Sequence, residues 1–143
     1  MTPSQIQLVQ STLPQLVAMK EDVARLFYFR LFQLDPALRS LFKSDLGQQG
    51  QKVMAMLGTL ISGLNRVDQV APILRDLGRR HVGYGVQDRD YATVGTALLW
   101  TLERGLGAAF TTDMRDSWIA TYFLVSQTML EGAKSAVALQ KAS

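Results

Sequence analysis

The residue best suited to chemistry in this sequence is its only histidine, His81, which lies within the stretch LGRRHVGYGV. Neutral imidazole is a common metal ligand. However, the chain has no second histidine and no cysteine, and no tight carboxylate cluster lies beside His81, so a bare zinc site lacks its ligands. One imidazole can hold an iron whose other four bonds come from a porphyrin. Two interpretations stay open at this point: a core histidine bonded to a carbonyl group, or the single protein ligand of a haem iron.

The segment before His81 is expected to form a helix that presents this histidine on its apolar face. Leu74, Leu77 and His81 follow one another at steps of three and four residues, which is the spacing of one helix face. Gly83 and Gly85 then interrupt the pattern, because glycine is a weak helix former that is free to turn. His81 is therefore expected near the C-terminal end of its helix.

The rest of the chain also has helical spacing of apolar residues and no convincing strand alternation. We expect Thr2 and Gln5 to form a capping box and Pro14 to kink the first helix, and we expect a loop at 43–47. The further expected helices cover 21–34, a short segment that starts at Asp35-Pro36, 48–64, a shorter helix capped by Asp68, a helix from Asp88 or Asp90 to about 105, and one from Thr111 or Thr112 to about 139. The pattern predicts an all-α protein of six or seven helices.

Length and composition predict a single domain over residues 1–143. The longest nearly apolar stretch, residues 53–64, is too short for a membrane span of about 20 residues, and the N-terminus lacks the features of a signal peptide. The net charge of +3 comes without a basic run or a nucleic-acid motif. We therefore expect a cytoplasmic protein with no nucleic-acid partner and no membrane insertion.

Several ordered stretches of the sequence resemble the globin family. They are LFYFRLF (26–32), DPALRSLF (35–42) and LGRRHVGYGVQDRDYATVGTALLWTLERGLGAAF (77–110), and they are followed by Trp118 and Tyr122. The sequence is similar to single-domain bacterial haemoglobins, to the globin domain of flavohaemoglobins and to neuroglobin over nearly the whole chain. The resemblance implies a globin fold of six to eight helices around a haem pocket, haem b as the cofactor, and His81 as the proximal iron ligand.

The same resemblance implies a distal pocket built from Tyr28, Phe42, Gln49 and Val53. Phe42 matches the phenylalanine that packs against the porphyrin, and Val53 lies one turn after Gln49, where it limits the ligand space. Without the resemblance, a tyrosine on a mostly apolar helix is more often a core residue. In this family, Tyr28 and Gln49 face the bound gas, and a donor to partly charged oxygen contributes about 1.5–3 kcal/mol.

Other positions are implied to contact the cofactor. Leu77 is expected to pack under the porphyrin, and Val86 is expected to touch its edge after the glycines turn the chain. Lys52 is expected to reach a haem propionate, with Arg80 as a weaker candidate, and a solvated side chain is the alternative for both.

On the proximal side, Tyr91 matches the tyrosine that flavohaemoglobins place beside the ligand histidine together with a glutamate. The glutamate position falls at Ala133, and Glu131, two residues away, is expected to point elsewhere. The glycines after His81 do not form a dinucleotide-binding motif. Strong oxygen activation is therefore in doubt, and turnover would need an external reductase.

The function that we expect is tight oxygen binding through Tyr28 and Gln49, used in nitric oxide dioxygenation with an external reductase. Oxygen, nitric oxide and carbon monoxide are the expected ligands. The alternative is reversible oxygen binding for storage or supply, and a gas sensor ranks last. Coordination of the iron by two histidines is impossible, because the chain has only one.

Overall fold

The computed structural model describes residues 1–42 and 45–142, and every regular element in these ranges is helical. The elements are α1 (Pro3–Ser11), α2 (Leu13–Ala18), α3 (Lys20–Leu34), the 3-10 helix η1 (Pro36–Leu41), α4 (Leu46–Ser62), α5 (Val67–Gly83), α6 (Asp88–Leu106), the 3-10 helix η2 (Gly107–Ala109) and α7 (Thr112–Ala142). The predicted all-α class is confirmed. No helix in the described ranges is long and apolar enough to cross a membrane.

The N-terminal helices begin as expected and then divide where a kink was predicted. Thr2 and Gln5 form the reciprocal capping box, with Pro3 in the first turn. Pro14 does not bend one continuous helix. Instead, α1 ends at Ser11 and α2 begins at Leu13, on either side of Thr12. The physical reason is that proline has no amide hydrogen to continue the ladder and crowds the preceding turn.

Two other helix boundaries differ from the sequence prediction. α4 begins at Leu46, because the side chain of Asp45 accepts a hydrogen bond from the Gln48 amide. This start takes up part of the predicted loop, of which residues 43 and 44 lie outside the described residues. α5 begins at Val67 with Arg66 at the N-cap, so Asp68 lies inside the first turn instead of capping the helix. There its carboxylate still interacts favourably with the positive end of the helix dipole.

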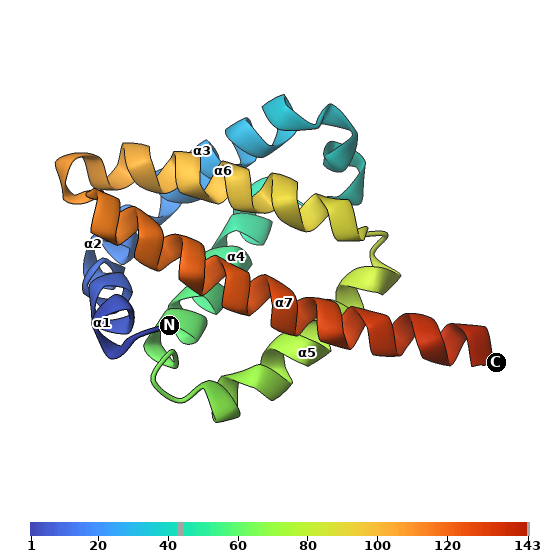
Figure 1. Ribbon diagram of the computed structural model, residues 1–143. Helices are drawn as coiled ribbons and strands as arrows, with labels where there is room; N and C mark the ends of the chain where they lie inside the picture. The colour runs from blue at the N-terminus through green and yellow to red at the C-terminus, as the bar shows by residue number, and fades with distance from the viewer. Residues whose placement is uncertain (43–44, 143) are drawn as a thin grey trace.

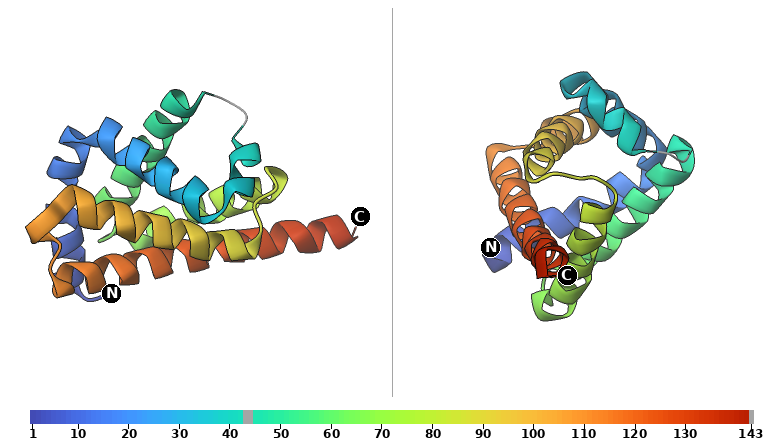
Figure 2. Two further views of the ribbon diagram at one scale, coloured as in Figure 1. Left: turned by 90° about the horizontal axis from the view of Figure 1, so that it is seen from above. Right: turned by 90° about the vertical axis from the view of Figure 1, so that its right-hand side faces the viewer.

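The helices form two layers. Figure 1 shows α7 across the front of the molecule, with α6 above it and α5 crossing it below. Figure 2 shows α3 and α4 behind these helices, with α3 packed against both α4 and α6. α1 and α2 close the end of the molecule where α7 begins.

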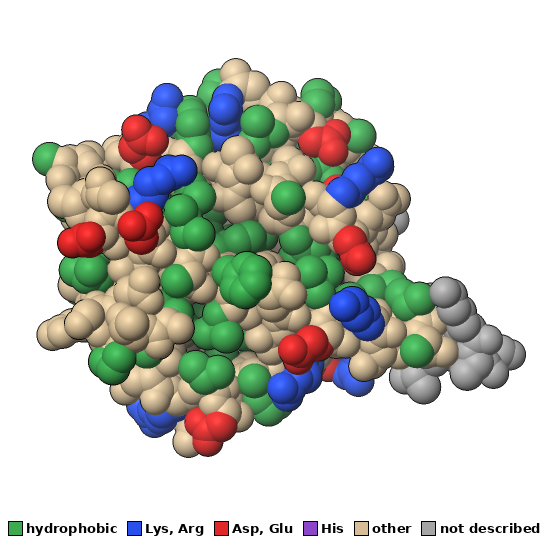
Figure 3. All heavy atoms as spheres, viewed as in Figure 1, with side chains coloured by type: hydrophobic (Ala, Val, Ile, Leu, Met, Phe, Trp, Pro, Cys, Tyr) green, Lys and Arg blue, Asp and Glu red, His purple; other side chains and the backbone are tan. Residues whose placement is uncertain are grey.

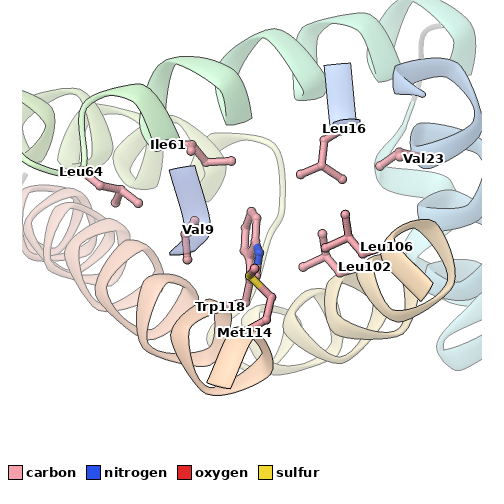
Figure 4. Close-up of a cluster of buried hydrophobic side chains, with 9 residues drawn as sticks. All are labelled: Val9, Leu16, Val23, Ile61, Leu64, Leu102, Leu106, Met114 and Trp118. Atoms are coloured by element: carbon pink, nitrogen blue, oxygen red, sulfur yellow. The ribbon is translucent and has the colours of Figure 1, made fainter. Parts of the chain in front are cut away.

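A buried cluster between these layers joins the N-terminal helices to α4, α6 and the start of α7. Trp118 of α7 lies at its centre and is 1% exposed. Figure 4 shows its indole between apolar side chains from α1, α2, α4 and α6, and the cluster consists of Val9, Leu16, Val23, Ile61, Leu64, Leu102, Leu106, Met114 and Trp118. Burial of these side chains stabilises the fold by roughly 25 cal/mol for each Å² of apolar surface removed from water.

α5 and α7 approach each other so closely that only glycine fits at the crossing. A β-carbon on Gly78 would lie 1.8 Å from the backbone oxygen of Met129, and one on Gly132 would lie 1.9 Å from the backbone oxygen of Arg75. Gly58 of α4 differs, because the nearest atom that its β-carbon would meet is 4.0 Å away, so that position does not need glycine for space.

Candidate functional site

His81 lies in the last turn of α5 with one ring nitrogen held by its own helix. Nδ1 lies 2.6 Å from the backbone oxygen of Leu77, one turn earlier. A carbonyl oxygen can only accept, so Nδ1 carries the proton and Nε2 keeps its lone pair. Among the described residues, no hydrogen bond involves Nε2. The ring is therefore oriented and held in the tautomer that a metal-binding imidazole requires.

The turn after His81 explains how α5 ends at this point. The amide of Val86 donates to the backbone oxygen of His81 at 3.0 Å, and the amide of Gly85 donates to Val82 at 3.1 Å. These two bonds form a Schellman motif, which needs a left-handed residue, and Gly85 has a φ of 94°. Gly83 was expected to share in the turn but is the last residue of the helix. Gly85 alone turns the chain, and Val86 is left half-buried beside the end of α5.

The surroundings of His81 favour its neutral form. Burial lowers the pKa of His81 below its ordinary value of 6.5, the hydrogen bond to Leu77 acts in the opposite direction, and the charge of Arg80 lowers the pKa further. Arg80 itself pairs with Asp76 at 2.9 Å, and both side chains are partly exposed. A neutral imidazole at physiological pH is the form that can bind a metal.

Three of the four predicted distal residues lie in one hydrophobic cluster. Tyr28, Phe42 and Val53 come together from α3, the end of η1 and α4. The rings of Tyr28 and Phe42 meet edge to face, with centroids 5.3 Å apart. Gly50 allows α4 to lie close to α3, since a β-carbon there would lie 3.0 Å from the β-carbon of Ala24, and it would also contact the ring of Tyr28 at 3.6 Å. The fold thus gathers residues that are far apart in sequence around one tyrosine.

The phenol of Tyr28 is a buried polar group without a partner in the described part of the structure. The residue is 5% exposed, and its Oη makes no hydrogen bond. Burial raises the pKa of Tyr28 to about 12, so the hydroxyl keeps its proton and can act as a donor. An unsatisfied buried hydroxyl is costly, and each one in a folded protein calls for an explanation. A small acceptor bound beside Tyr28 would provide one.

The remaining predicted residues lie at the edges of this region or in a neighbouring cluster. On α4, Gln49 is half-buried and Lys52 is exposed. Leu77 packs with Leu60, Val70 and Leu74 in a hydrophobic cluster of α4 and α5. The structure therefore brings Tyr28, Phe42 and Val53 together, whereas Lys52 stands at the surface.

Tyr91 is held through its backbone by a residue that the sequence analysis did not assign to the site. Tyr122 of α7 donates from its hydroxyl to the backbone oxygen of Tyr91 at 2.5 Å. Its ring covers Gly95, where a β-carbon would lie 2.6 Å from the ring. Burial raises the pKa of Tyr91 and of Tyr122. The sequence signal that points to this contact is a glycine four residues after Tyr91, facing an aromatic residue of the last helix.

The hydroxyl of Tyr91 is itself buried and has no partner among the described residues. The position expected for a glutamate is the buried Ala133, and Glu131 points outward and pairs with Arg75 at 3.3 Å. The expectation that Glu131 lies elsewhere on the helix is confirmed. No carboxylate of the described chain therefore polarises Tyr91 through a hydrogen bond to its hydroxyl.

A hollow of about 560 Å³ lies between α3 and α4 and includes Tyr28 but not His81. Its rim carries Lys20, Glu21 and Arg25, and its floor is largely apolar. His81 does not line this hollow, so the imidazole nitrogen and the hollow beside Tyr28 are separate features of the site. In the described ranges, no group of three or more His, Cys, Asp or Glu side chains could hold a metal ion.

Comparison with known proteins identifies the class to which this fold and site belong. The globin family model matches residues 25–129, which is most of the chain. Zebrafish neuroglobin (Danio rerio) is 34% identical over 119 residues, covering 73% of this chain and 75% of that protein. A flavohemoprotein of Bordetella parapertussis is 32% identical over 125 residues, covering 85% of this chain but 31% of that protein.

The fold agrees with this match. A bacterial globin from Campylobacter jejuni superposes with a TM-score of 0.85 at 21% identity, covering 96% of this chain and 99% of the other. The chain belongs to the globin family. It spans about a third of the flavohemoprotein that it matches, so it corresponds to only part of that larger protein.

Proposed function

We propose that this globin binds haem b with His81 as the proximal iron ligand. The observation that carries the proposal is the bond from Nδ1 of His81 to Leu77, which leaves a half-buried, neutral Nε2 with its lone pair free. The described chain offers no set of side chains that could complete a metal site around this nitrogen. A porphyrin supplies the four further bonds that iron needs.

The other side chains proposed for this pocket are apolar or peripheral. Phe42 and Val53 share the cluster of Tyr28 and would contact the cofactor on the distal side. Leu77 and Val86 flank His81 in sequence, and both are half-buried. Lys52 is exposed on α4, so it would meet a propionate only where the cofactor reaches solvent.

Haem, when bound, supplies a reduced iron to which oxygen, nitric oxide and carbon monoxide can bind. Tyr28 would donate its hydroxyl proton to a hydrogen bond with oxygen, which its raised pKa and lack of another partner favour. Gln49 would supply a second donor from α4. Because oxygen gains more negative charge on binding than carbon monoxide does, these donors favour oxygen and slow its release.

Slow release suits consumption of oxygen better than delivery, so we propose nitric oxide dioxygenation as the reaction. One nitric oxide, one oxygen and one electron yield one nitrate, and the electron must come from a reductase. Flavohemoprotein relatives, which extend well beyond the region matched by this chain, support a partner of that kind. The second candidate, reversible oxygen binding, is favoured by the unpaired hydroxyl of Tyr91, which lacks a carboxylate partner in the described chain.

Two experiments test these proposals in sequence. The purified chain is first titrated with haem and followed by its absorption spectrum, and failure to form a saturable one-to-one complex would refute the haem site. The complex is then supplied with nitric oxide, oxygen, a nicotinamide cofactor and a reductase. Many nitrates formed per chain would support dioxygenation. A single nitrate per chain followed by arrest would favour reversible oxygen binding.

A further inference from the structure

The outer surface of α3 and α6 carries two aromatic rings and two arginines in one group. Phe29 of α3 is 59% exposed, and its ring centroid lies 6.2 Å from that of the half-buried Trp100 on α6. Arg30 follows Phe29 on α3, and Arg104 lies one turn after Trp100 on α6. We call the group of Phe29, Arg30, Trp100 and Arg104 the α3/α6 face.

The two helices that carry this face lie side by side at the top of Figure 1. The left view of Figure 2 looks down on them, and they are in direct contact along their length. The upper edge of Figure 3, where these helices run, shows lysine or arginine side chains beside hydrophobic ones. Positive charge and apolar surface are therefore mixed on this side of the molecule.

Trp100 holds both guanidinium groups of the α3/α6 face near its indole. Cζ of Arg104 lies 3.6 Å from the ring centroid, and Cζ of Arg30 lies 5.4 Å from it. Both distances are within the range of cation–π attraction. A guanidinium that rests on an aromatic ring keeps its N–H edge free for a carboxylate, and its side chain loses less freedom when it binds one.

Neither arginine of the α3/α6 face has a carboxylate partner within residues 1–42 and 45–142. Arg30 donates from one terminal nitrogen to the neutral Oε1 of Gln33 at 2.8 Å. Its Nε is buried and has no hydrogen-bond partner among the same residues. Arg104 is exposed and makes only the contact with Trp100. Two positive charges therefore share one indole without an anion between them.

The acidic side chains of α3 and α6 closest in sequence to this face do not neutralise it. Asp22, two turns before Phe29, pairs with Arg25 of its own helix. Glu103 adjoins Arg104 in sequence but lines a separate hollow together with Arg115. The α3/α6 face therefore keeps an excess of positive charge around its aromatic rings.

We propose that the α3/α6 face binds an acidic segment of a partner protein, in which carboxylates accompany an aromatic or large apolar side chain. Arg30 and Arg104 would donate hydrogen bonds to the carboxylates, in the paired geometry that a planar guanidinium favours. The apolar side chain would pack on the exposed ring of Phe29. Tryptophan and arginine contribute most of the binding energy at many protein interfaces, and this face brings both together.

Other partners match this chemistry less well. A second copy of the same face would add two more unpaired arginines and no carboxylate for them. Nucleic acid binds more tightly as more phosphates are neutralised, and two arginines neutralise few. The attraction of an anionic membrane likewise grows with the number of basic residues near its surface. An acidic protein segment supplies carboxylates for both arginines and an apolar side chain for Phe29.

Calorimetric titration of the purified full chain with a synthetic peptide tests this proposal. The probe is a short peptide in which phenylalanines stand between pairs of glutamates, and a matched peptide carries glutamines in place of the glutamates. The glutamate peptide should bind with a dissociation constant on the order of 100 μM. The glutamine peptide should bind at least about tenfold more weakly, and salt should weaken the glutamate peptide, because charge drives the contact.

Tryptophan fluorescence gives a second measurement of the same binding. The chain has two tryptophans, and Trp118 is 1% exposed in the core. A change in emission on adding the glutamate peptide should therefore come from Trp100. Trp100→Phe should remove the change in emission.

Substitutions locate the binding on the α3/α6 face. Arg104→Gln and Phe29→Gln should each weaken binding of the glutamate peptide at least about fivefold, because each removes one of the two kinds of contact. The matched control is Arg89→Gln, which removes an exposed arginine from the same helix, roughly 22 Å from Arg104 along the helix axis. It should leave binding unchanged. Circular dichroism confirms that each variant retains its helix content.

Neither haem nor the proposed reaction is needed for these measurements. A wild-type chain that does not bind the glutamate peptide at millimolar concentration overturns the proposal. So does equal binding of the glutamine peptide, or a loss in Arg89→Gln as large as that in Arg104→Gln. Phosphatidylglycerol vesicles and a short DNA duplex are titrated in parallel. If either binds more tightly than the peptide and is released by Arg104→Gln, the face takes that partner and the proposal is wrong.

Discussion

Nδ1 of His81 lies 2.6 Å from the backbone oxygen of Leu77, one turn earlier in the same helix. This bond requires Nδ1 to donate, so it also decides that Nε2 is the nitrogen with a free lone pair. The helix that presents the imidazole therefore also selects its tautomer. The imidazole therefore already has the orientation and the tautomer that metal binding requires when no cofactor is bound.

Replacing His81 by glycine should abolish stable haem retention, because the only imidazole of the chain is lost. Added imidazole should restore the haem spectrum by filling the space of the missing ring. Absorption spectra after gel filtration, with and without imidazole, make the measurement. Tyr84→Ala is the matched control, since this exposed ring lies 5.7 Å from that of His81 at the end of α5. Haem loss of equal extent in both variants would indicate a disturbed helix end instead of a lost ligand.

Tyr28→Phe in the haem-loaded chain should speed oxygen dissociation by roughly ten- to hundredfold, because it removes a hydrogen bond of about 1.5–3 kcal/mol. Carbon monoxide dissociation should change much less, since bound carbon monoxide carries less charge. Stopped-flow displacement measures both rates. An oxygen rate within about twofold of the wild type would contradict a donor role for Tyr28.

In the chain without haem, the same Tyr28→Phe substitution should raise the free energy of unfolding by about 1 kcal/mol. The reason is that the hydroxyl is buried and has no partner in the described structure. Urea denaturation at neutral pH, followed by circular dichroism, measures the change. A destabilised variant would show that the hydroxyl has a partner in solution.

The difference between wild type and Tyr28→Phe should grow at alkaline pH. The pKa of Tyr28 is about 12 in the folded chain and 10.0 ordinarily. Between these values the unfolded chain loses this proton and the folded chain keeps it, so stability falls as pH rises. The phenylalanine variant lacks this contribution. Unfolding measurements at neutral pH and near pH 11 should therefore show a larger gap between the two proteins at high pH, and an unchanged gap would contradict the raised pKa.

Gly78→Ala should destabilise the fold strongly, by about 3 kcal/mol or more, because its methyl group would overlap the backbone of Met129. Two backbones must move apart to admit it. Gly83→Ala is the matched control on the same helix, where a β-carbon would meet nothing within 4 Å. It should be neutral or stabilise α5 by up to about 1 kcal/mol. Thermal unfolding of both variants makes the comparison, and equal effects would show that the close crossing is absent in solution.

The helical class and most helix boundaries could be predicted from the sequence, because capping residues and apolar spacing are local signals. The capping box at Thr2 and the end of α3 at Leu34 are examples. The division at Thr12 was not predicted, since a proline pattern alone does not distinguish a kinked helix from two helices. The turn at Gly85 was predicted only in part, because Gly83 and Gly85 look alike until φ is known.

For the candidate site, the amino-acid sequence is enough to show that one imidazole is available and that no second histidine can compete with it. It also predicted which residues could gather around a bound gas. The tertiary structure was needed to show that Tyr28 is buried without a partner among the described residues, that Gln49 is half-buried, and that Tyr122 holds the backbone of Tyr91. The physical reason is that burial and hydrogen-bond satisfaction depend on contacts between helices that are distant in sequence, whereas the pattern within one helix records only which face is apolar.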